Sequence, residues 1–282
     1  MKRLSVVFAL SLAVLAAKAD DFGLWTEVGL GQKLGNTGLS ASADLGFRAN
    51  NSLRNVDRWS AGVGLNYDIC HWLEVGVGYT YMYSYAGEEY KDNYKKDGVT
   101  KEGYNLTHGY WRSKNRFTAS LKASYDVGRF SFSLRERYQL TGYNSVGVVK
   151  DKYRYNYVYD QAGNIVDKID QSGYPELGVP DRKESKSKEY LRSKLEVGYN
   201  IRHCSFDPFV SVELENNLRE AFKLDEVRYT AGLEWKISKQ VNLSGAYHFN
   251  KGSDADNDDD LHAIEISLKL KNLFGGVAKK TK

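Results

Sequence analysis

The sequence has little of what helical and cross-linked proteins use. Its 282 residues include only three Pro, two Met and two Cys. Beyond one apolar stretch at the N-terminus, no segment approaches the roughly 20 apolar residues of a membrane-spanning helix, which excludes a conventional helical membrane protein. What is abundant instead is Tyr, with 21 residues, and Gly, with 26. This composition favours strands and tight turns, and 41% apolar residues argue against a disordered chain.

The first 19 residues have the pattern of a secretory signal peptide. Positive charge at Lys2 and Arg3 precedes the apolar stretch, and small residues end it at Ala17 and Ala19. We expect cleavage before Asp20. Removing Lys2, Arg3 and Lys18 from the 40 basic residues leaves 37 against 36 acidic ones, so net charge gives no support for binding nucleic acid, and export argues against that partner.

From Phe22 onward, hydrophobicity alternates with a period of two. In the segment from Leu39 to Arg48, for example, the odd-numbered residues are apolar and most even-numbered ones are polar or Gly. Eleven segments of this kind, each near the length of a tilted membrane strand, are predicted: 24–33, 39–48, 58–68, 73–85, 116–127, 130–143, 190–202, 210–217, 227–237, 241–250 and 262–274.

The connections between these segments alternate between short and long. Short ones are expected at 35–38, 68–71, 126–129, 202–205 and 238–240, and long ones at 49–57, 86–115, 144–189, 218–226 and 251–260. The sequence therefore predicts an all-β fold, an antiparallel transmembrane β-barrel of about 10–12 strands over 20–274, with short periplasmic turns, long extracellular loops and a C-terminal tail at 275–282. Aromatic residues near both strand ends are typical of membrane interfaces, so we expect contact with lipid in the cell outer membrane.

Two features do not fit this prediction. Bacterial single-chain barrels have an even number of strands, so eleven segments indicate either a missed strand or a first segment that does not cross fully. Glu136 also falls on the lipid side of its segment, between Leu134 and Tyr138, where a position near the outer rim would cost least.

Four short stretches resemble an uncharacterised family of outer-membrane barrels from Gram-negative bacteria, a "domain of unknown function": 22–27 (FGLWTE), 47–51 (FRANN), 56–60 (VDRWS) and 134–139 (LRERYQ). This resemblance implies fold and location only, because the family has no assigned activity. The hairpin layout also looks, more loosely, like small monomeric porins that admit acidic oligosaccharides.

The polar sides of the strands carry a pattern of charge. Six basic residues are expected to form one basic wall, with acidic residues further round the barrel: Arg116, Lys122, Arg135, Arg137, Arg192 and Lys194, then Glu213, Glu215 and Glu234. One interpretation is a transverse field that selects anionic or zwitterionic solutes; the other is a salt-bridged plug that fills a narrow barrel. Inward glycines, at 29, 31, 62, 64, 76 and 78, favour open space or mark strand curvature.

Other motifs give weaker indications. Ser244 and His248 are the generic candidates for a hydrolase, without a Gly-x-Ser-x-Gly element. The acidic run 254–260 has partial calcium-loop spacing but lacks Gly at its sixth position. Cys70 and Cys204 are expected to be free thiols, since three strand steps separate them. Tyrosines in the two longest loops either bind glycans or a protein, or pack the loops together, and packing is favoured.

The function predicted from the sequence is passive passage of small polar or acidic solutes, with no metal and no cofactor. The alternative is a closed barrel with a structural, adhesion or protein-partner role, and a hydrolase ranks third.

Overall fold

A computed structural model describes residues 22–50, 55–96, 98–170, 175–252 and 261–273. The expected signal peptide at 1–19, the acidic run at 254–260 and the tail at 275–282 lie outside these residues. Within them, no helix is long and apolar enough to cross a membrane.

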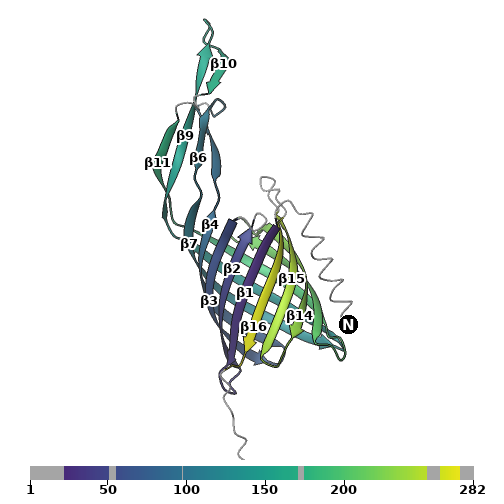
Figure 1. The fold of residues 1–282 in the computed structure, drawn as a ribbon. Coiled ribbons are helices and arrows are strands. Elements are labelled where there is room, and N and C mark those ends of the chain that lie inside the picture. Colours follow the sequence, from purple (N-terminus) through teal and green to yellow (C-terminus); the bar gives the residue numbers. More distant parts are fainter. Residues whose placement is uncertain (1–21, 51–54, 97, 171–174, 253–260, 274–282) are drawn as a thin grey trace, which may run out of the picture. The chain divides into compact units, whose positions relative to one another are not determined.

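Eleven strands form a closed barrel (Figure 1), which confirms the predicted fold class and strand number. Each of the eleven alternating segments corresponds to one barrel strand. In their order around the barrel, the strands are β1 (Phe22–Lys33), β16 (Leu261–Lys271), β15 (Val241–Gly252), β14 (Lys223–Lys236), β13 (Phe206–Asn217), β12 (Lys186–Tyr199), β8 (Phe130–Tyr143), β7 (Tyr110–Val127), β4 (Leu73–Ala86), β3 (Asn55–Cys70) and β2 (Leu39–Asn50).

The odd strand number is resolved by a parallel closing pair. β1 pairs with β16 in parallel, from Phe22 opposite His262 to Gly31 opposite Lys271, while its other edge pairs antiparallel with β2. The expectation of a missed strand or an incomplete first crossing is therefore wrong. In an up-and-down barrel with an odd number of strands, the first and last strands run in the same direction, so a parallel pair is the only way to close it.

The connections at the two rims of the barrel differ less in length than the sequence suggested. β2 ends at Asn50 and β3 begins at Asn55, and β13 ends at Asn217 with β14 beginning at Lys223, so strands take up part of two of the five expected long loops, 49–57 and 218–226. Polar residues in strands that extend beyond the alternating apolar positions were mistaken for loop. The opposite rim has connections as short as 71–72 and 128–129.

Two more of the expected loops, 86–115 and 144–189, fold for the most part as a second compact unit, made of residues Ser84–Ser113 and Tyr143–Lys186, and most of the fifth, 251–260, lies outside the described residues. Its strands are β5 (Glu89–Tyr94), β6 (Lys101–Thr107), β9 (Val146–Tyr159), β10 (Ile165–Asp170) and β11 (Glu176–Lys183). β9 is central: it pairs with β6 along one edge and with β11 and β10 in succession along the other. The single barrel expected over 20–274 thus includes two segments that form a separate sheet.

The tyrosines of this second unit contact one another across the strands. The rings of Tyr90, Tyr104 and Tyr153 stack in a row with centroids 4.5 and 4.4 Å apart. These contacts show that tyrosine side chains pack the sheet, with their ring faces against neighbouring rings.

The barrel distributes its side chains in the reverse of a soluble protein. Large apolar residues are exposed on its outside, such as Leu45 at 65% and Val63 at 58%, whereas Arg192 and Glu213 are buried within it. Few apolar side chains are buried anywhere in the described residues. A soluble fold would leave this much aliphatic surface in water, so the outer face is built for an apolar surrounding.

Glu136, the misfit of the sequence prediction, lies on this outer face with a partner. Its carboxylate accepts a hydrogen bond of 2.6 Å from the Ser193 hydroxyl on the neighbouring strand. Glu136 is partly buried and lies on the same face of β8 as Tyr138, two residues further along, whose hydroxyl donates a hydrogen bond to Glu189. A hydrogen bond and a position beside this polar group reduce the cost of a carboxylate on an apolar surface.

Candidate functional site

The inside of the barrel holds a cavity of about 1030 Å³, and all eleven barrel strands contribute residues to its lining. It is lined mainly by polar and charged side chains, including eleven basic and eight acidic residues. Because strands alternate their side chains between two faces, the polar sides of the alternating segments meet here. We call this cavity the lumen.

Seven of the nine charged residues singled out in the sequence line the lumen: Arg116, Arg135, Arg137, Arg192, Lys194, Glu213 and Glu234. Lys122 is exposed and shares the strand face of Thr118 and Ser120, which do line it. Glu215 is held beside the lumen by Arg192, with Nε of Arg192 3.1 Å from its carboxylate. Neither Lys122 nor Glu215 is part of the cavity lining itself.

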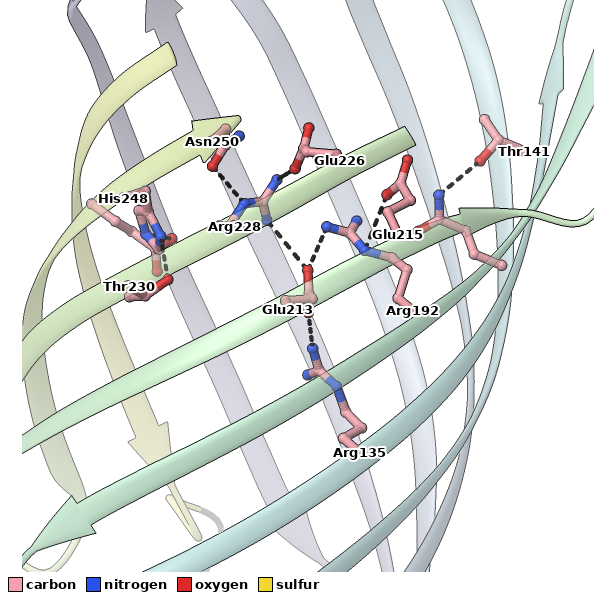
Figure 2. A network of polar contacts seen from close by, with 12 residues as sticks. Arg135, Thr141, Arg192, Glu213, Glu215, Glu226, Arg228, Thr230, His248 and Asn250 are labelled. Carbon is pink, nitrogen blue, oxygen red and sulfur yellow. Dashed lines mark hydrogen bonds and ion pairs between the residues drawn. The ribbon is translucent and has the colours of Figure 1, made fainter. Parts of the chain in front are cut away.

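The acidic residues do not form a separate patch, because Glu213 lies among the basic ones (Figure 2). Its carboxylate accepts hydrogen bonds from Arg135 at 2.7 Å and from Arg192 at 2.5 Å, and Arg228 lies 3.6 Å away. Arg228 also donates to Glu226 at 2.8 Å and to Asn250 at 2.9 Å. We call these residues, with Glu215, the Glu213 network; it pairs two residues of the expected basic wall, Arg135 and Arg192, with carboxylates.

This network runs along one wall of the barrel. It joins β8, β12, β13, β14 and β15, which are consecutive in the strand order, and Figure 2 shows the contacts passing from strand to strand. An ion-paired plug would instead connect strands on opposite sides. The network therefore stiffens one side of the lumen and leaves the cavity beside it.

Arg137 differs from its neighbours in the basic wall. Within the described residues its guanidinium has neither a hydrogen bond nor an ion pair, and its Nε is buried. The charges that act on it from across the lumen include Glu27, and Arg137 in turn is the positive charge that acts on Asp44. β8 lies four and five places from β2 and β1 in the ring of eleven, so these carboxylates face Arg137 from the opposite wall.

Glu27 and Asp44 were missed in the sequence, as were Arg48 and Arg58, although all four lie on polar strand faces. The alternation shows which face a residue occupies, and that signal was available. What it does not show is which strands oppose one another across a closed barrel, and this depends on the strand number and the parallel seam.

The inward glycines do not all mark open space. A Cβ added at Gly62 would lie 2.5 Å from an Asp44 carboxylate oxygen, and one at Gly76 would lie 2.3 Å from the Asn66 amide oxygen. At Gly29 the nearest atom would be 3.9 Å away. Several of these glycines therefore give room to a polar side chain of the next strand, whereas a Cβ at Gly29 or Gly31 would make only ordinary van der Waals contacts.

The generic hydrolase candidates are bonded to other residues. The Ser244 hydroxyl shares a 2.6 Å hydrogen bond with Ser267. His248 is bonded through Nδ1 to Thr230 at 2.9 Å and through Nε2 to Glu265 at 3.1 Å, and its ring stacks on Trp25. Both nitrogens of His248 are thus occupied by partners other than Ser244.

Two further predictions concern cysteine and metal. Cys70 and Cys204 are free. Among the described residues, no group of three or more His, Cys, Asp or Glu side chains is placed to hold a metal ion.

One ion pair outside the barrel strands has a clear electrostatic effect. Lys101 donates to Asp92 at 2.5 Å in the second unit. The hydrogen bond lowers the pKa of Asp92 and raises the pKa of Lys101. Both groups are therefore charged at neutral pH.

Comparison with known proteins identifies a family and three similar structures. Residues 22–261 match the model of the family described as "Protein of unknown function (DUF2490)", which confirms the resemblance to an uncharacterised family. No curated protein matches the sequence.

The similar structures have low identity to this chain. The translocator domain of the autotransporter NalP from Neisseria meningitidis is 11% identical, with a TM-score of 0.46 and coverage of 78% of this chain and 70% of that one. The porin NanC is 10% identical, with a TM-score of 0.38 and coverage of 84% and 93%. The outer-membrane protease OmpT from Escherichia coli is 11% identical, with a TM-score of 0.40 and coverage of 78% and 80%.

Proposed function

This chain belongs to the DUF2490 family of proteins of unknown function, and we propose that it is an outer-membrane channel through which small polar or acidic solutes pass passively. The observation that carries the proposal is that Arg137, whose guanidinium pairs with no side chain of the described residues, faces Glu27 and Asp44 across the lumen. Opposed charges that do not pair have space between them, and they set up a field across the path of a solute.

The balance of charge favours anions. Eleven basic side chains against eight acidic ones line the lumen, and the Glu213 network fixes several of them in place. An anion can bind the guanidinium groups on one wall of the lumen. A dipolar solute can align in the field between the two walls. Neutral polar solutes are expected to pass with less discrimination.

The proposed location rests on the outer surface. Exposed aliphatic side chains cover the middle of the strands, and exposed aromatic residues lie toward both rims, with Trp72 and Trp235 near the short connections and Trp59, Tyr81 and Tyr83 toward the other rim. This arrangement suits an apolar layer with two interfaces. The proposed partners are therefore membrane lipid outside and small acidic solutes inside, with no nucleic acid.

Conductance in a planar bilayer tests the proposal. The refolded protein is expected to give steady single-channel currents, with an anion preference measured as the reversal potential in a salt gradient. Arg137→Glu should reduce that preference and Asp44→Asn should increase it, because each variant changes a charge that lines the lumen. Lys33→Gln, which removes a basic residue outside the lumen lining, is the matched control.

Folding is checked separately by heat-dependent migration in gel electrophoresis. Absence of current from a folded barrel would overturn the channel and leave a closed barrel with a structural, adhesion or partner-binding role. Currents with the same selectivity in Arg137→Glu and in the control would retain the channel but reject the proposed role of the charges.

A further inference from the structure

A second group of arginines lies in the lumen, near the connection between β2 and β3. Arg48 and Arg58 are directly opposite each other in the antiparallel register of these strands, and both line the lumen. Arg48 lies over the Trp25 ring, with its guanidinium carbon 3.9 Å from the ring centroid, and the guanidinium carbon of Arg228 lies 5.3 Å from the same centroid. Trp25 is 3% exposed, so it forms a rigid base under this group.

These arginines repel one another. Arg48 lies within range of the positive charges of Arg58, Arg116 and Arg228. Like charges directly opposite on neighbouring strands destabilise a sheet, and a low local dielectric strengthens the repulsion. A fold that places several guanidinium groups together therefore needs compensating negative charge.

The carboxylates nearby provide little of that compensation. The nearest carboxylate to Arg58 is its neighbour Asp57, at 3.9 Å, and the Arg58 Nε is buried without a hydrogen-bond partner in the described residues. Glu265 attracts Arg48, but it accepts a hydrogen bond from His248. Arg228 is engaged by Glu213 and Glu226. The Arg48–Arg58 pair thus retains guanidinium donors that no carboxylate of the described residues takes up.

We propose that Arg48 and Arg58 form a binding site for a doubly charged tetrahedral oxyanion, the phosphate group of a phosphorylated solute. Two planar guanidinium groups at paired positions of neighbouring strands, both lining the lumen, can each donate two hydrogen bonds to such a group. A monocarboxylate has one negative charge and two oxygens in a plane, so it serves only one of the two forks. This site rests on the proposed function in one respect: both require that the lumen be filled with water.

Binding of inorganic phosphate to the purified, folded protein tests this site. At pH 8 inorganic phosphate is mainly the dianion, because its second pKa is about 7; the corresponding pKa of a phosphate ester is about 6. Titration calorimetry gives the affinity, and quenching or enhancement of Trp25 fluorescence locates it, with Trp25→Phe identifying the contribution of this ring. Acetate at the same ionic strength is the comparison anion.

The site requires that phosphate bind more tightly than acetate and that Arg58→Gln weaken phosphate binding about tenfold, the effect of losing one charge-assisted contact. Arg48→Gln should have a similar effect. Lys33→Gln, with the same loss of charge away from the lumen lining, should bind as the wild type does. Equal affinity for acetate, no phosphate binding, or unchanged affinity in a folded Arg58→Gln variant would overturn the site.

Because binding is measured without current, the two proposals fail separately. A conducting barrel that does not bind phosphate retains the channel and loses this site. A barrel that binds phosphate but carries no current retains the site and loses the channel.

Discussion

Replacing Glu213 by Gln tests how far the network on one wall stabilises the barrel. Glu213 holds Arg135 at 2.7 Å and Arg192 at 2.5 Å, with Arg228 at 3.6 Å, and its side chain is 8% exposed. Removing one partner of a buried ion pair costs about 3–5 kcal/mol, whereas an exposed pair is worth about 0–1 kcal/mol. Because the network borders a cavity and Arg135 is 25% exposed, the loss should be near the lower limit, about 3 kcal/mol.

The free energy of unfolding is measured by urea titration of the refolded protein in lipid vesicles. Glu234→Gln is the matched control: its carboxylate accepts from the neutral Asn242 side chain, so we expect a loss below about 1 kcal/mol. The double variant with Arg192→Gln should lose less than the sum of the two single variants, since each single change leaves an uncompensated partner. A loss below about 1 kcal/mol for Glu213→Gln, or one equal to that of the control, would refute the reasoning.

Two further predictions concern glycine and pH. Gly62→Ala should lower the free energy of unfolding by about 1–3 kcal/mol, because the added Cβ would lie 2.5 Å from an Asp44 carboxylate oxygen. Gly29→Ala should change the free energy of unfolding little, because the nearest atom to its added Cβ would be 3.9 Å away. Equal urea midpoints for the two variants would contradict this prediction. In the second unit, hydrogen bonds from Asn164 and from the backbone of Ala162 lower the pKa of Asp160. These bonds therefore stabilise the turn at any pH above the ordinary aspartate pKa of about 4. The stabilisation is lost as the pH falls through the lowered pKa of Asp160. Amide hydrogen exchange at Ala162 and Asn164 should accelerate at acid pH in the wild type beyond its chemical rate, and the Asp160→Asn variant should lack this extra dependence.

The alternation of side chains was enough to predict the barrel strands. A segment such as 39–48 has one apolar and one polar face whichever strand it pairs with, so its role follows from local sequence alone. The alternation is interrupted where β3 extends back to Asn55, because the register with β2 shifts between Arg48 and Ala49. There both faces carry polar side chains, and apolar periodicity no longer distinguishes strand from loop.

The arrangement of charge could be predicted only in part. That Arg135 and Arg192 face inward follows from the period of two, but their pairing with Glu213 depends on register between strands. Arg137 faces Glu27 and Asp44 only because eleven strands place β8 across from β1 and β2. Relations across a barrel are set by closure, which no single segment encodes. The second unit was likewise hidden, since its strands pair segments separated by the whole of β7 and β8.

The parallel seam between β1 and β16 limits how the chain can be rearranged. The start of β1 and the end of β16 lie at opposite ends of ten paired residues, a separation of about 33 Å along the strands. In an even-stranded barrel the corresponding ends share one rim, where a few residues can join them. A circular permutant of this barrel would instead need a linker as long as a strand, passing through the lumen or along the outer face, so the order in which these strands follow one another is fixed by topology as well as by sequence.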